Sequence, residues 1–71
     1  MATDVVAQIT GTVWEIKVGV GDEVAEEQVL VVLESMKMEM PVESPASGRV
    51  ASIAVEKGQA VEEGEVLLTL D

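Results

Sequence analysis

The feature that most constrains the fold of this chain is an internal repeat with an offset of 37 residues. Sliding the sequence against itself by 37 positions brings eleven residues onto identical partners. The identical pairs are Val5/Val42, Gly11/Gly48, Val13/Val50, Ile16/Ile53, Val18/Val55, Gly21/Gly58, Val24/Val61, Glu26/Glu63, Val29/Val66, Leu30/Leu67 and Leu33/Leu70. Two repeats are too few for a solenoid, so we expect two similar half-domains that close one core about a pseudo-twofold axis.

The first half of the sequence predicts a strand, a turn and a second strand. Residues 12–18 alternate in polarity, residues 19–22 break the alternation with two glycines, and residues 29–33 form a continuous apolar run. Between the turn and the run, residues 23–28 are mostly polar and could form a short helix. We expect Val24 to anchor this stretch to the core.

The second half repeats this order. Alternation extends over residues 49–55, a turn is expected at residues 57–59, and residues 66–70 form the apolar run. Val61 holds the position of Val24 and should also contact the core. Because Val and Ile favour strands, we expect an all-β fold, a flattened barrel or sandwich of two pseudo-twofold-related sheets of short strands.

Size and composition restrict how such a fold is stabilised. The 71 residues leave room for one domain, residues 1–71, with no Cys for a disulfide and neither Cys nor His for a zinc site. A domain near this size buries only about 60% of the surface of its unfolded chain. We expect no metal site, and stability must come from an apolar core, which the hydrophobic content of 48% permits.

The charge of the chain argues against several classes of partner. Four basic and fourteen acidic residues give a formal net charge of −10. Nucleic acids and anionic membranes both require basic patches, so we expect neither as a partner. Residues 1–5 lack the pattern of a secretion signal, and no apolar stretch has the length of a membrane span. These features predict a cytoplasmic location.

The segment that joins the two halves, residues 34–40, is expected to be a hairpin with its tip near Met36 and Lys37. Two-residue hairpin turns require positive φ at both central residues and therefore prefer Asn-Gly or Asp-Gly. This tip contains no Gly, Asn or Asp. Holding Met or Lys there costs roughly 1 kcal/mol or more per residue, and an unfavourable local choice often marks a functional site.

Three of the four methionines, Met36, Met38 and Met40, cluster around Lys37. Methionine is flexible and polarisable, which suits a surface that meets several partners. A structural alternative stays open on composition alone: Met40 belongs to the core, Met36 and Met38 are ordinary surface residues, and Lys37 keeps the hairpin soluble.

Trp14, the only aromatic residue, also has two interpretations. Its repeat partner is Ala51, so one large and one small residue could fill the core across the pseudo-twofold axis. Alternatively, the indole is an exposed docking ring for a partner protein. We favour the core position, because alternation places Trp14 on the strand face of Ile16 and Val18.

The segment Glu34-Ser35-Met36-Lys37-Met38 resembles the biotin-acceptor motif Glu-Ala-Met-Lys-Met of the biotinyl/lipoyl attachment domain family. The resemblance extends over nearly the whole chain, including the turn segments 18–24 and 58–64 and the segment 44–48 after the hairpin. It implies two four-stranded sheets with a modified lysine at a hairpin tip. Ser35 for the usual Ala, residues 8–11 in place of a proline-containing turn, and Glu27 for a common Gly are departures. The chain resembles the small free-standing carriers, without a long linker or a protruding thumb loop.

The resemblance implies a biotin carboxyl carrier, a component of a carboxylase system and not itself an enzyme. A biotin protein ligase would attach biotin to Lys37 through a biotinyl-adenylate. A biotin carboxylase and a carboxyltransferase would then use the arm to move a carboxyl group, commonly to an acyl-CoA, as in the acetyl-CoA carboxylase of fatty acid biosynthesis. Met36 and Met38 are the expected recognition neighbours. We expect a monomer when the carrier is free.

Several alternatives remain at this point. Glu34 and Glu39 flank the tip and either steer a basic ligase surface or are simply solvated charges. A lipoyl carrier would share the fold, although lipoyl domains usually have Asp-Lys-Ala at the tip. An unmodified interaction module could bind a partner through the methionines. Catalytic residues are not expected, because no dyad, phosphate loop or calcium loop is visible.

Overall fold

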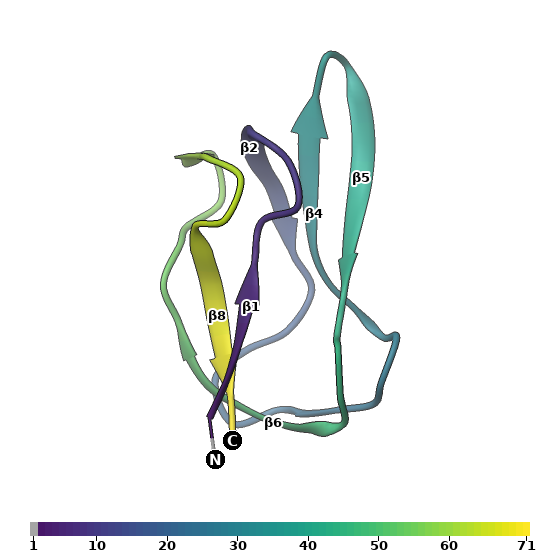
Figure 1. Ribbon diagram of the computed structural model, residues 1–71, viewed down its shortest axis with the longest axis vertical. Coiled ribbons are helices and arrows are strands. Elements are labelled where there is room, and N and C mark those ends of the chain that lie inside the picture. Colours follow the sequence, from purple (N-terminus) through teal and green to yellow (C-terminus); the bar gives the residue numbers. More distant parts are fainter. Residues whose placement is uncertain (1) are drawn as a thin grey trace.

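Each half of the chain contributes two strands to each of two antiparallel sheets. The computed structural model describes residues 2–71 (Figure 1). Its strands are β1 (Thr3–Val6), β2 (Gly11–Ile16), β3 (Glu23–Val24), β4 (Val29–Ser35), β5 (Met38–Glu43), β6 (Gly48–Ile53), β7 (Ala60–Val61) and β8 (Val66–Leu70). The strand orders are β1-β8-β6-β3 in one sheet and β5-β4-β2-β7 in the other.

The predicted pseudo-twofold repeat is present in the topology. An offset of 37 carries β2 onto β6 and β3 onto β7 residue for residue, and it carries β1 into β5 and β4 onto β8. Applied to the order β1-β8-β6-β3, the same exchange gives β5-β4-β2-β7, which is the second sheet. The two halves are therefore interleaved, and neither sheet could form from one half alone.

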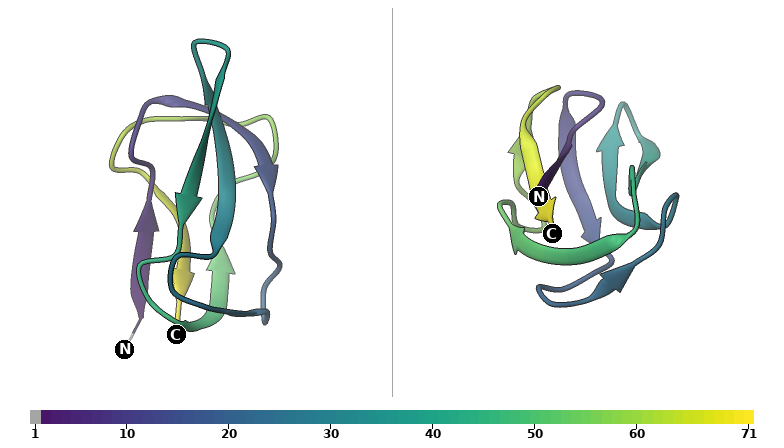
Figure 2. Two further views of the ribbon diagram at one scale, coloured as in Figure 1. Left: turned by 90° about the vertical axis from the view of Figure 1, so that its right-hand side faces the viewer. Right: turned by 60° about the horizontal axis from the view of Figure 1, so that its bottom comes forward.

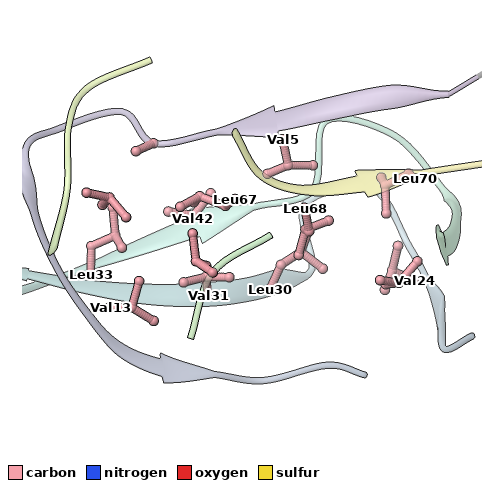
Figure 3. Packing of buried hydrophobic residues seen from close by; sticks show 14 residues of the cluster. Val5, Val13, Val24, Leu30, Val31, Leu33, Val42, Leu67, Leu68 and Leu70 are labelled. Atoms are coloured by element: carbon pink, nitrogen blue, oxygen red, sulfur yellow. The ribbon is translucent and has the colours of Figure 1, made fainter. Parts of the chain in front are cut away.

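The core lies between the two sheets and is aliphatic throughout (Figure 3). Both apolar runs supply it, because β4 and β8 are each one of the two inner strands of their sheets. Val24 and Val61 are buried, as predicted for the anchors of the connecting stretches. The fully buried side chains include Leu30, Leu33, Leu67, Leu68 and Leu70.

The short helix considered for residues 23–28 does not form. Glu23 and Val24 instead pair with β6 as strand β3, and a turn follows at residues 26–27. The turn contains Glu27 at φ 72°, a left-handed conformation that a helix cannot accommodate, and the Gln28 side chain accepts the N–H of Ala25 (3.0 Å). Within residues 2–71 there is no helix long and apolar enough to cross a membrane.

The prediction that Trp14 lies in the core is wrong. The side chain is 44% exposed, because a β-bulge interrupts the alternation of β2. Val13 pairs with Leu33 and Glu15 with Val32, so Trp14 is the extra residue of the bulge. Val13 and Ile16 consequently face the core, while Trp14 and Glu15 lie on the outer face of the sheet.

Candidate functional site

The β4–β5 hairpin has a two-residue turn made of Met36 and Lys37. Ser35 and Met38 form the last cross-strand pair, which leaves only these two residues at the tip. Their φ angles are 53° and 66°. The predicted positive φ at both central residues is thus confirmed, in residues that do not favour it.

The tip is the most protruding part of the molecule. In two views at right angles the β4–β5 hairpin extends beyond all other strands and loops (Figures 1 and 2). Lys37 is exposed, and Met36 is 92% exposed. A partner can therefore approach the Lys37 amine without contacting the rest of the fold.

The three methionines differ in burial along the hairpin. Exposure falls from 92% at Met36 to 62% at Met38 and 39% at Met40, which pairs with Leu33 at the upper edge of the core. Met40 is therefore partly exposed, and the alternative that places it in the core is wrong. Met36 and Met38 form a flexible apolar surface on both sides of Lys37, a composition suited to protein contact.

The charges around the tip are unpaired acids and one base. The two ion pairs within residues 2–71 join Lys17 to Glu15 (3.2 Å) and Arg49 to Glu23 (3.1 Å), so neither involves Lys37. Glu34 and Glu39 are direct cross-strand partners below the tip, and both are exposed. Like charges placed opposite one another destabilise a strand pair, so this arrangement favours a positively charged partner over the isolated fold.

The hairpin is supported at its base, by Ser44, and near its tip, by Gly11, and sequence reasoning missed both features. Ser44 is buried, its backbone exchanges hydrogen bonds with Gln28 and Glu27 (both 2.8 Å), and its hydroxyl donates to the Ala46 carbonyl. Gly11 lies so close to β4 that a Cβ there would be 2.5 Å from the Glu34 carbonyl oxygen. The sequence did contain a signal for Gly11, since glycine recurs at the equivalent position, Gly48. In the structure a Cβ on Gly48 would likewise be 2.6 Å from the Asp71 carbonyl oxygen.

The ends of the described chain lie far from this site. Thr3 pairs with Leu70, and β1 begins and β8 ends at the end of the molecule opposite the hairpin tip (Figure 1). A protruding amine on a two-stranded hairpin, with its base fixed in a core, is an arrangement that presents a side chain to other proteins. It fits a group attached covalently through the amine, since nothing encloses the tip.

Comparison with known proteins assigns the family. Residues 1–70 match the family model described as Biotin-requiring enzyme. The chain is 40% identical over 70 residues to the Biotinylated protein TB7.3 homolog of Mycobacterium leprae, covering 99% of each. It is 42% identical over 64 residues to a Biotin carboxyl carrier protein of Streptococcus mutans, covering 90% of this chain and 49% of the relative.

Two further relatives are much larger proteins. A dihydrolipoyllysine-residue acetyltransferase component of the pyruvate dehydrogenase complex of Azotobacter vinelandii is 48% identical over 56 residues, 79% of this chain and 9% of that protein. The crystal structure of Kluyveromyces lactis urea carboxylase matches with a TM-score of 0.94 and 31% identity. That match covers 100% of this chain and 6% of the carboxylase, so this fold occurs there as a small part of a carboxylase.

These matches confirm the resemblance stated from the motif, the two-sheet fold and the expectation of covalent biotin. They also agree with a carrier component and not a catalytic one. The chain belongs to the biotin-requiring family of biotinyl domains, as a biotin carboxyl carrier.

Proposed function

We propose that Lys37 is the biotin attachment site and that the protein moves a carboxyl group between a biotin carboxylase and a carboxyltransferase of the acyl-CoA type. The observation that carries this proposal is the position of Lys37, which is exposed at φ 66° in a two-residue tip beyond the rest of the fold. A left-handed conformation is energetically unfavourable for lysine, and such strained residues cluster at functional sites.

Attachment would be an acyl transfer catalysed by a separate biotin protein ligase. The Lys37 amine, after loss of a proton to the ligase, attacks the carbonyl carbon of a biotinyl-adenylate. A C–N amide bond forms, the C–O bond to phosphate breaks, and AMP leaves. The modification removes one of only four positive charges in the chain, so the carrier becomes still more acidic.

The contribution of this chain is presentation and recognition. The exposed side chains of Met36 and Met38 offer apolar contact on both sides of Lys37. Glu34 and Glu39 give the hairpin a negative face that would orient a basic ligase surface and speed encounter. When attached, biotin supplies a ring nitrogen that accepts and releases the carboxyl group, and the long arm lets it reach two active sites.

Three further expectations accompany this proposal: a monomer when free, a ligase as the first partner, and a cytoplasmic location. The net charge of −10 opposes self-association and supports the first of these. The location stays a prediction.

Transfer of label from bicarbonate tests the proposal. Biotinylated protein is incubated with a biotin carboxylase, ATP and labelled bicarbonate, and the label on the carrier is then followed after a carboxyltransferase and an acyl-CoA are added. We expect label to appear on the wild-type carrier, to pass to the acyl-CoA, and to be absent from Lys37→Arg. A carrier that is lipoylated by its native ligase, or label that persists in Lys37→Arg, would contradict the proposal.

A further inference from the structure

The outer face of the β5-β4-β2-β7 sheet carries an apolar surface outside the core. Val32 is only 8% exposed although it does not belong to the core cluster, and its neighbours Val31 and Leu33 do. Alternation therefore directs Val32 to the outer face, where its cross-strand partner is Pro41 and the bulged Trp14 lies on the other side. Trp14 therefore gives this face an exposed aromatic ring.

A groove adjoins Trp14 at the edge of the same sheet. It has a volume of about 470 Å³, and its walls are Trp14 and its β2 neighbours on one side and Lys57 and Gly58 on the other. The N–H of Gly58 donates to the Val13 carbonyl (2.7 Å), which fixes the Lys57–Gly58 turn beside β2. Neither ion pair within residues 2–71 involves Lys57. The groove therefore combines an aromatic ring with a hydrogen-bond donor that has no charged partner.

The repeat shows that these two side chains are particular to the sheet that carries the hairpin. Trp14 corresponds to Ala51, which is the extra residue of an equivalent bulge in β6, and Lys57 corresponds to Val20. The backbone is thus repeated at both places, while the ring and the donor occur at one of them. That one place lies on the sheet that continues into the Lys37 tip.

We propose that the biotin arm of Lys37 folds back along the outer face of this sheet, so that its bicyclic ring rests on the Trp14 indole with Lys57 donating to the ureido carbonyl oxygen. The inference rests on the proposed attachment at Lys37. Trp14 and Lys57 would form a resting site for the ring between visits to partner enzymes.

The lengths permit this contact. Trp14 is level with Leu33 on β4, and Lys37 lies four residues farther along the hairpin. Four residues at about 3.3 Å each, and one strand spacing of about 4.8 Å, place the tip roughly 14 Å from the Trp14 backbone. The lysine side chain and the valeryl chain contribute about ten single bonds, which extend roughly 13 Å before the ring begins.

The chemistry also permits it. Aromatic faces stack on flat polar rings, and a tethered ligand experiences an effective concentration in the mM range. A ring with only mM affinity for the site would then rest there for a large part of the time and still be released to an enzyme. The contact is intramolecular, so it should not depend on protein concentration.

Fluorescence tests the proposal, because Trp14 is the only aromatic residue of the chain. The readout is quenching of Trp14 emission by acrylamide in unmodified protein and in protein shown by mass to carry biotin on Lys37. We expect quenching to fall on modification, equally at low and high protein concentration. Nuclear Overhauser contacts between the indole and the biotin ring should appear in the same sample. Free biotin added to Lys37→Arg at a concentration well below the mM range should change nothing, because the site binds an untethered ring with only mM affinity.

The repeat provides a matched control. The double variant Trp14→Ala/Ala51→Trp moves the fluorophore to the equivalent bulge on the other sheet, and its emission should not respond to biotinylation. In a second assay, Trp14→Ala should raise the rate of avidin capture up to about twofold, because a ring with mM affinity at a mM effective concentration is bound about half of the time. Lys57→Gln should raise this rate less, and Arg49→Gln, on the other sheet, should leave it unchanged.

Three results would overturn the resting site while leaving biotin attachment intact. Two of them are unchanged quenching in fully biotinylated protein and an equal response from the indole at position 51. A response that disappears on dilution would also overturn it, because the indole would then contact a second molecule. If mass analysis instead finds no biotin on Lys37 after treatment with an active ligase, the proposed function itself fails.

Discussion

Glu34 on β4 and Glu39 on β5 face each other as direct antiparallel partners, two residue pairs below the exposed turn of the hairpin. Neither takes part in an ion pair of residues 2–71. The strand pair that presents Lys37 therefore contains a like-charge contact that works against its own stability. We expect such a contact where two acidic side chains are used to bind a basic partner, at some cost to the stability of the free protein.

Exchanging one of these acids for a base should separate stability from recognition. Glu39→Lys creates an opposite-charge pair with Glu34, so we expect the free energy of unfolding to rise by about 0.5 kcal/mol. Biotinylation by the ligase should become several-fold slower at low salt, and this difference should shrink at high salt. Urea denaturation and initial rates of biotinylation measure the two effects.

Glu43→Lys is the matched control, because it changes the net charge equally at the base of β5, opposite Val29. It should leave the biotinylation rate closer to wild type than Glu39→Lys does. Equal slowing by both variants would show that net charge matters and the position of Glu39 does not.

The left-handed conformation of Met36 predicts that the tip can be stabilised. Asn adopts positive φ more readily than Met, so Met36→Asn should raise the free energy of unfolding by about 0.5–1 kcal/mol. The same change removes an apolar side chain beside Lys37 and should slow the ligase. Met38→Asn removes an equivalent side chain from a strand position, where no such gain is expected; a gain there would contradict the explanation.

Gly11 and Gly48 offer a test of how the hairpin is supported. Alanine at either position would bring a Cβ to within 2.5 or 2.6 Å of a backbone oxygen, so each variant should lose about 1–3 kcal/mol of stability. Only Gly11 lies against Glu34, next to the tip. Gly11→Ala should therefore also reduce biotinylation at a temperature where both variants are folded by circular dichroism, and Gly48→Ala should not.

Glu27 and Gly64 occupy equivalent turns with φ angles of 72° and 88°. Glu27→Gly removes the strain of a left-handed conformation but raises the conformational entropy of the unfolded chain. We expect the free energy of unfolding to rise by about 0.5 kcal/mol as the net result. Gly64→Ala should cost about 1 kcal/mol from backbone strain alone, because no atom lies within 4 Å of the added Cβ. Thermal unfolding measures both variants: the melting temperature should rise for Glu27→Gly and fall for Gly64→Ala.

Much of the fold could be predicted from the repeat. The two apolar runs, the shared core and the place of the linking hairpin follow from the repeat, but the interleaving of the two halves in both sheets does not. The tip was predictable for the same reason. Lys37 lies where one half ends and the other begins, in a turn that lacks the usual turn residues.

The position of Trp14 was misjudged because it was inferred from Ile16 and Val18. Those two residues do pack against the core, but the bulge between Val13 and Glu15 shifts the alternation by one residue. No Gly marks the bulge, and the one sign of it in residues 12–18 is that two apolar residues, Val13 and Trp14, are adjacent. Ser44 was missed for a different reason: its importance lies in its burial and in backbone hydrogen bonds to residues 27 and 28, which leave no pattern in the sequence.

The most direct test of the account is the mass of the purified protein after incubation with its native ligase, biotin and ATP, followed by peptide mapping. We predict a single biotin adduct on the peptide that contains Lys37, none on Lys17 or Lys57, and no adduct on a folded Lys37→Arg variant. A lipoyl adduct, an adduct on another lysine, or an unmodified Lys37 in the presence of an active ligase would contradict the assignment of Lys37 as the biotin attachment site.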